Sequence, residues 1–138
     1  MTKTALALAC AMPLIACASD LPMSCDMSVK SFFAPLVQGN LIATKPISVS
    51  ENSLNEFRPK LLSHLTAYGM QVTSILGYAD DPLLFVRKGD HPSYGYGVAV
   101  RESIANVQAQ LSSMGATQAK TARVSTGITL IFCKGEPQ

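Results

Sequence analysis

The stretch VAVRESIANVQAQLSSMGATQAKTARVSTGITLIFC, residues 98–133, decides the fold class of this 138-residue chain. Residues 98–101 predict a short strand, and the apolar residues that follow recur at the spacing of an amphipathic helix that Gly115 ends. Residues 117–125 and 128–133 then predict two more strands. The stretch therefore predicts a strand-helix-strand-strand unit. Its helical positions are Ile104, Val107, Leu111 and Met114.

A second helix is predicted upstream of this unit. Ser53 and Glu56 have the spacing of a helix capping box, and apolar residues recur after them at helical intervals. Because Pro59 cannot donate a helical hydrogen bond, this helix begins either at Ser53 or near Arg58. Gly69 is expected to end it. The apolar positions are Leu54, Phe57, Leu61, Leu62, Leu65 and Tyr68.

The two halves of the chain follow a similar order. Residues 71–78 and 83–86 predict two strands around a turn. Shifted by 46 residues, positions 65–89 align without a gap on positions 111–135, with five identities in 25 positions. Such a match is compatible with a true duplication and with chance. The shared order nevertheless predicts two strand-helix-strand-strand pseudo-repeats.

The first part of the chain adds two shorter elements. Asp26 is expected to cap a short turn or helix that Pro35 disturbs, and residues 41–49 predict a strand. Together these elements predict an α+β fold, with an antiparallel or mixed sheet and two helices on one of its faces. We expect residues 1–16 to be a signal peptide, residues 17–40 a lipid-anchored segment and residues 41–138 a small α+β domain.

Composition excludes several classes of protein. Hydrophobic residues make up 48% of the chain and charged residues 14%, which is typical of a compact domain and not of a disordered one. The length suits one domain. The formal net charge is +2, and the basic residues are scattered along the chain. This pattern argues against a nucleic-acid-binding surface.

Residues 1–16 have the three parts of an export signal: a basic start at Lys3, an apolar middle and small residues at the end. The apolar run is too short to span a bilayer, which takes about 20 residues. The alternative is a buried strand or helix at the N-terminus.

Two cleavage routes fit the signal. One of them is cleavage by an ordinary signal peptidase, for which Ala16-Cys17-Ala18 is a small-x-small site. That route would release a soluble periplasmic or secreted chain beginning near Ser19.

The stretch Leu14-Ile15-Ala16-Cys17 resembles the lipobox of bacterial lipoproteins. The resemblance covers these four residues and the signal, and it implies that Cys17 receives a diacylglycerol and that the new N-terminus is acylated, for example with palmitate. Several acyl chains give stable membrane anchoring. Ala18, in place of aspartate, points to an outer membrane location facing the periplasm. The resemblance implies a location and carries neither a fold nor an activity.

The four cysteines fit this location. The signal removes Cys10 and lipidation occupies Cys17, so Cys25 and Cys133 remain. In an oxidising periplasm they are expected to form a disulfide. The alternative is a buried free Cys133 with Cys25 exposed. Eight residues lead from Cys17 to Cys25, so a fully stretched tether reaches about 30 Å and keeps the domain near the membrane.

Candidate site residues gather in the loop predicted at residues 89–97. His91 could serve as a general base or metal ligand, or lie in a solvated turn. Tyr94 and Tyr96 are suited to contacting a partner, since tyrosine has a rigid apolar face and a polar tip. The alternative is that both face the core from the start of a strand. Asp80 and Asp81 precede a proline and are assigned to a turn.

No catalytic motif is present in the sequence, which has neither a nucleophile-elbow serine nor a C-x-x-C pair. We therefore expect a non-enzymatic protein without a cofactor or metal. The first hypothesis is an envelope lipoprotein that binds another envelope component as an assembly or accessory module, for example of a secretion, conjugation or pilus system. The second is a periplasmic inhibitor or immunity protein that covers the active site of a toxin or hydrolase.

Overall fold

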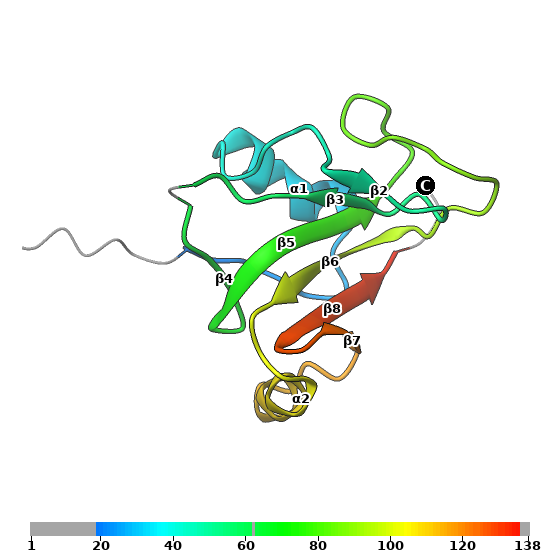
Figure 1. The fold of residues 1–138 in the computed structure, drawn as a ribbon. Coiled ribbons are helices and arrows are strands. Elements are labelled where there is room, and N and C mark those ends of the chain that lie inside the picture. The colour runs from blue at the N-terminus through cyan, green and yellow to red at the C-terminus, as the bar shows by residue number, and fades with distance from the viewer. Residues whose placement is uncertain (1–18, 62, 136–138) are drawn as a thin grey trace, which may run out of the picture.

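The structure is a computed structural model that describes residues 19–61 and 63–135. These residues form an α+β fold with a mixed sheet, as the sequence predicts (Figure 1). The sheet has eight strands, and the described residues contain two helices. The strands run in the order β1-β4-β5-β6-β8-β7, and β3 joins β2 to β5. The elements are β1 (Ser19–Asp20), α1 (Val29–Gln38), β2 (Ser48–Val49), β3 (Asn55–Phe57), β4 (Leu65–Ala67), β5 (Met70–Tyr78), β6 (Gly95–Val100), α2 (Ile104–Ser113), β7 (Lys120–Ser125) and β8 (Ile128–Lys134).

The antiparallel strands β5, β6 and β8 form the centre of the sheet. Strand β6 is buried at every position, as expected for a central strand covered on both sides. The second half of the chain follows the sequence prediction, because α2, β7 and β8 lie where the periodicity placed them. Gly115 follows α2 with a φ of 69°, which suits the helix end predicted there.

The helix predicted at residues 53–68 is wrong. Residues 55–57 form β3 and pair with β5, and residues 65–67 form β4. Pro59 interrupts the run, and Ser53 has a φ of 65°, outside the helical region. Leu61 is fully exposed, so the apolar residues do not share one buried face. Pairing with the sheet, together with the buried contacts of Asn55, overrides the helical periodicity.

The strand predicted at residues 83–86 is also wrong. The backbone N–H groups of Leu84 and Phe85 donate to the carbonyl of Asp81 and close a turn. Residues 41–49 are likewise mostly irregular, with an isolated bridge at Ile42 and the two-residue strand β2. The first half of the chain therefore lacks the helix and the second strand of the predicted repeat, and the pseudo-repeat is not confirmed.

The N-terminal helix α1 is longer than predicted. Ser28 caps it instead of Asp26, with its hydroxyl accepting from the Ser31 N–H at 3.0 Å. Pro35 lies inside the helix without ending it. Phe32, Phe33 and Leu36 are buried beneath the helix and hold it on the sheet.

The buried apolar side chains form a single hydrophobic core, whose members range along the sequence from Leu21 to Cys133. It does not divide at residue 40, because α1 contributes some of its largest buried side chains. The predicted disulfide is present: Cys25 and Cys133 are joined, with their Cα atoms 4.9 Å apart. The bond ties the segment before α1 to β8.

Candidate binding surface

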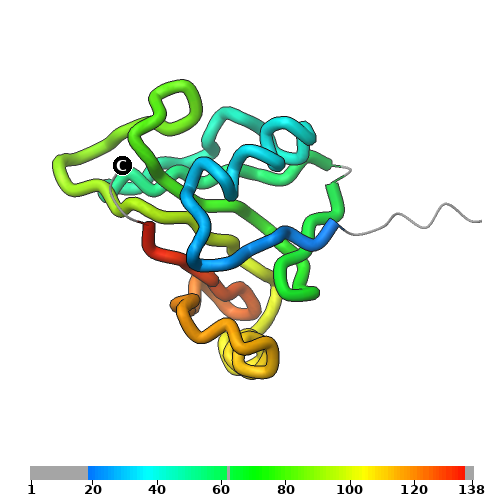
Figure 2. The backbone as a smooth tube through the Cα atoms, turned by 180° about the vertical axis from the view of Figure 1, so that it is seen from behind, coloured from blue at the N-terminus to red at the C-terminus, as the bar shows by residue number. Residues whose placement is uncertain are grey.

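Residues 79–94 connect β5 to β6 without a helix or strand, and we call them the 79–94 loop. Figures 1 and 2 show it on the side of the molecule opposite the first described residues. Leu83 is 96% exposed and Val86 51% exposed, although the loop also contains buried residues. A loop of this length inside a compact domain is usually functional or disordered. Its contacts show that this one is ordered.

The two ends of the loop are joined through one carboxylate. Asp80 Oδ1 accepts a hydrogen bond from the Tyr78 hydroxyl at 3.1 Å, and Asp80 Oδ2 accepts one from the Tyr94 hydroxyl at 2.8 Å. Burial raises the pKa of Tyr78, and the hydrogen bond to Asp80 raises it further. For Tyr94 the hydrogen bond to Asp80 is the main cause of the raised pKa. Both phenols therefore remain protonated donors at neutral pH.

The middle of the loop is held by two buried polar side chains, Ser53 in the turn before β3 and Asn55 at the start of β3. Asn55 donates to the Val86 carbonyl and accepts from the Val86 N–H, both at 2.9 Å. The Ser53 hydroxyl donates to the Lys88 carbonyl at 2.6 Å and accepts from the Lys88 N–H at 2.8 Å. Both Asn55 and Ser53 have no exposed area. Each side chain therefore satisfies both the backbone N–H and the backbone carbonyl of one loop residue, as a neighbouring strand would do in a sheet.

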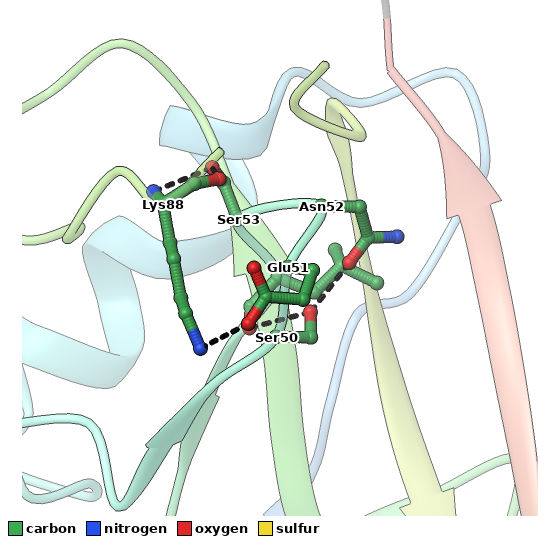
Figure 3. Close-up of polar contacts among 6 residues, drawn as sticks. Ser50, Glu51, Asn52, Ser53 and Lys88 are labelled. Atoms are coloured by element: carbon green, nitrogen blue, oxygen red, sulfur yellow. Dashed lines mark hydrogen bonds and ion pairs between the residues drawn. The ribbon is translucent and has the colours of Figure 1, made fainter. Parts of the chain in front are cut away.

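Figure 3 shows the exposed side of the contact between the 79–94 loop and the turn at residues 50–53. The Lys88 ammonium lies 2.5 Å from a Glu51 carboxylate oxygen, and Ser50 donates to Asn52 within the turn. The Lys88–Glu51 pair is exposed, so it adds at most about 1 kcal/mol. Gly89 has a φ of 74°, and a Cβ there would collide with the Glu51 carbonyl, so the close approach needs glycine.

One aromatic residue anchors the loop in the core. The ring of Phe85 lies 5.0 Å from that of Phe33, 5.9 Å from that of Phe57 and 6.0 Å from that of Tyr78, measured between centroids. The rings meet edge to face, a favourable geometry for aromatic pairs. Phe85 points inward while Leu83 points into solvent. The loop thus presents apolar side chains on a fixed backbone.

A groove of about 730 Å³ runs between α1 and the first part of the loop. Phe33, Ala34 and Val37 line it from the helix, and Leu83 and Leu84 line it from the loop. Charged groups also line it, namely Lys30, Asp80 and Asp81. Leu83 therefore belongs both to the lining of the groove and to the exposed part of the loop.

The structure separates the predicted site residues. His91 is exposed on the loop, and no group of three or more potential metal-ligating residues occurs within residues 19–61 and 63–135. Tyr94 is half-buried and bound to Asp80. Tyr96 is fully buried, stacks on Phe32 with centroids 4.5 Å apart, and donates its hydroxyl to the Ser24 carbonyl. For Tyr96 the core-facing alternative is therefore correct, and it cannot contact a partner.

Asp81 lies in the turn assigned to it, where its side chain accepts from the Leu83 N–H at 3.1 Å. Cys17 lies outside the described residues. Sequence reasoning missed Leu83, Ser53 and Asn55. Ser53 and Asn55 stand among polar residues in the sequence, so nothing local signals their burial or identifies their partners.

No helix among the described residues has the length and apolar character needed to cross a membrane. Comparison with protein-family models, with curated proteins and with solved structures found no match.

Proposed function

We propose that this chain is an exported lipoprotein, anchored through Cys17, that binds another envelope protein with its 79–94 loop and does not catalyse a reaction. The observation that carries the proposal is the loop itself: Leu83 and Val86 are exposed on a backbone that the buried side chains of Asn55 and Ser53 hold by hydrogen bonds. Such pre-organisation favours binding, because little conformational entropy remains to be lost when a partner docks.

Two further features support export. The disulfide between Cys25 and Cys133 is of the kind that persists in oxidising compartments. The signal-like start and the lipobox precede it directly in the sequence. Lipid attachment at Cys17 would place the domain at the outer membrane, facing the periplasm. Cleavage by an ordinary signal peptidase would instead give a soluble chain with the same binding surface.

Polar side chains in the loop have structural roles that suit a binding module. The Asp80 carboxylate is shared by two phenols, and Tyr94 supports the end of the loop through that contact. His91 stays exposed and is available as a rim contact. An interface between proteins usually has an apolar centre, here Leu83 and Val86, surrounded by a polar rim.

The groove beside α1 supports the second hypothesis, an inhibitor or immunity protein. A loop with an exposed leucine next to a groove can cover the entrance of a toxin or hydrolase active site. Affinity purification from envelope extracts separates the two hypotheses, since the first predicts structural components of an assembly and the second a single toxin or lytic enzyme.

The binding test compares two substitutions at exposed apolar positions. Leu83→Asp changes the loop, whereas Val124→Asp changes β7, where Val124 is 61% exposed. We expect Leu83→Asp to abolish recovery of the partner by cross-linking and purification, and Val124→Asp to retain it. Loss with both variants or with neither would refute the loop as the contact surface.

The anchoring test uses Cys17→Ala. Intact mass should show the lipid on the native protein, and the variant should move from the detergent phase to the aqueous phase. Unchanged partitioning of the variant would refute anchoring while leaving the loop experiment valid.

A further inference from the structure

From Ser19 onward, two positions after the proposed lipid site, the chain is bound to the domain and does not form a free tether. The Ser19 N–H donates to the His64 carbonyl at 2.9 Å, and the Leu21 N–H donates to the Thr66 carbonyl at 2.7 Å. Strand β1 pairs in parallel with β4, and Leu21 and Met23 are each 7% exposed. The chain is therefore fixed to the sheet from Ser19 onward.

The Asp20 side chain strengthens this attachment. Its Oδ1 atom accepts from the Thr66 hydroxyl at 2.8 Å and from the Gly69 N–H at 3.2 Å. Two residue steps separate Cys17 from Ser19, a chain length that reaches at most about 7 Å between Cα atoms. A lipid on Cys17 would therefore bring this edge of the domain to the membrane surface. A free tether from Cys17 to Cys25 would instead allow the domain to lie up to about 30 Å away.

The surface beside Ser19 has the chemistry of a membrane contact. Leu61 is 100% exposed, and Arg58, Lys60 and His64 are also exposed. We call these four residues the basal patch. The Ser63 N–H donates to the Lys60 carbonyl at 2.9 Å, so the chain turns sharply just before His64. In both overall views the connection between β3 and β4 lies on the same side as β1 (Figures 1 and 2).

Charge favours anionic headgroups as the occupant of this patch. Residues 57–79 contain no Asp or Glu. The nearby Asp20 carboxylate already accepts two hydrogen bonds. Each Lys or Arg close to an anionic membrane strengthens association about fivefold. An exposed leucine flanked by cations is suited to entering the interface beneath the headgroups.

The geometry points to a fixed orientation on the bilayer: the basal patch lies on an anionic phospholipid surface, with Leu61 in the interface, and the 79–94 loop faces away from the membrane. This inference rests on the proposed lipidation of Cys17. It adds a second membrane contact, made by the folded domain itself, and it directs the binding surface toward partners in the aqueous compartment.

The chain contains no tryptophan, which allows a direct test. Leu61→Trp and Leu83→Trp each introduce one fluorophore at an almost fully exposed position, so neither should disturb folding. The full lipidated proteins are reconstituted in phosphatidylcholine vesicles containing phosphatidylglycerol and brominated acyl chains. We expect the tryptophan at position 61 to emit at shorter wavelength and to be quenched severalfold more than the one at position 83.

Equal quenching at the two positions, or stronger quenching at position 83, overturns the orientation. Vesicle flotation and intact mass are recorded on the same samples. Protein that floats with its lipid but shows equal quenching refutes the orientation alone, while protein that is unmodified at Cys17 and does not float refutes the anchor and the orientation together.

A pair of charge reversals tests the headgroup contact. Arg58→Glu with Lys60→Glu, in the Leu61→Trp background, should reduce quenching severalfold on vesicles that contain phosphatidylglycerol. Lys120→Glu with Arg123→Glu changes the net charge equally, at exposed positions of β7, and should leave quenching unchanged. An equal response of the two pairs overturns the assignment of the basal patch to anionic lipid.

Discussion

Asn55→Ala should release the 79–94 loop from the sheet. The substitution removes three hydrogen bonds: two with Val86 at 2.9 Å and one from the Asn55 amide to the Ser53 carbonyl at 2.7 Å. A typical internal hydrogen bond adds about 1 kcal/mol to stability, so we expect the free energy of unfolding to fall by roughly 3 kcal/mol. Domains of this size have about 5–15 kcal/mol available, so the variant should still fold.

The loss of stability in Asn55→Ala should be concentrated in the 79–94 loop. Val86 is 51% exposed, so water can reach its backbone groups once the loop separates from Asn55. Local opening should then expose the Val86 and Lys88 amides, which now donate to Asn55 and Ser53. Amide hydrogen exchange measures this directly, and exchange at these two amides should accelerate far more than exchange in β5.

The assay combines urea unfolding, followed by circular dichroism, with that exchange measurement. Ser50→Ala is the matched control, because Ser50 is exposed and its hydroxyl bonds stay within the turn. We expect the control to change stability by less than about 0.5 kcal/mol. If Asn55→Ala behaves like Ser50→Ala in both measurements, Asn55 does not hold the loop.

Three other predictions concern the disulfide, the central strand and the tyrosines. Replacing both Cys25 and Cys133 by serine should lower the free energy of unfolding by up to about 4.7 kcal/mol, the chain-entropy value for a loop near 100 residues, and an unchanged urea midpoint would contradict this. Gly97→Ala should cost at least about 1–3 kcal/mol in thermal unfolding, because the new Cβ would lie 2.5 Å from the Ile131 carbonyl oxygen and 2.9 Å from the Phe132 ring. The pKa of each of the four tyrosines is raised above the ordinary 10.0, chiefly by burial for Tyr68, Tyr78 and Tyr96 and by the Asp80 hydrogen bond for Tyr94. Above about pH 10 the unfolded chain therefore loses protons that the folded chain retains, so stability should fall as pH rises, and tyrosinate absorbance should appear at higher pH in the native protein than in urea.

The elements that the sequence predicted correctly depend on nearby residues. Helix α2 has its serine cap, its apolar face and its terminal glycine within a dozen positions, and β7 and β8 form a hairpin next to it. The disulfide followed from counting the cysteines. The helix at residues 53–68 failed because its periodicity was matched locally while the deciding contacts are distant: Asn55 is bound to Val86, 31 residues away.

The candidate surface was only partly predictable for the same reason. Tyr94 was recognised, but its role as a support for the loop depends on Asp80, 14 residues earlier. Tyr96 lies only two residues after Tyr94, but it belongs to β6, which is buried at every position, and it packs in the core against Phe32. Leu83 carries no sequence signal of exposure, because an apolar residue between a proline and a leucine is equally typical of a buried strand.

The positions of the anchor and the loop have a mechanical consequence when Cys17 carries lipid. A partner that pulls on the 79–94 loop loads the attachment on the opposite side of the molecule, through β1 and its two-residue pairing with β4. That pairing covers only two residues, and after it the buried side chains of Leu21 and Met23 and then the disulfide at Cys25 hold the chain to the domain. If every contact before the disulfide were lost, the reach of the chain from Cys17 to its next attachment would rise to about 30 Å and stop there, because the disulfide is covalent. With Cys17 lipidated as proposed, the disulfide would therefore limit how far the domain can move from the membrane, in addition to stabilising the fold.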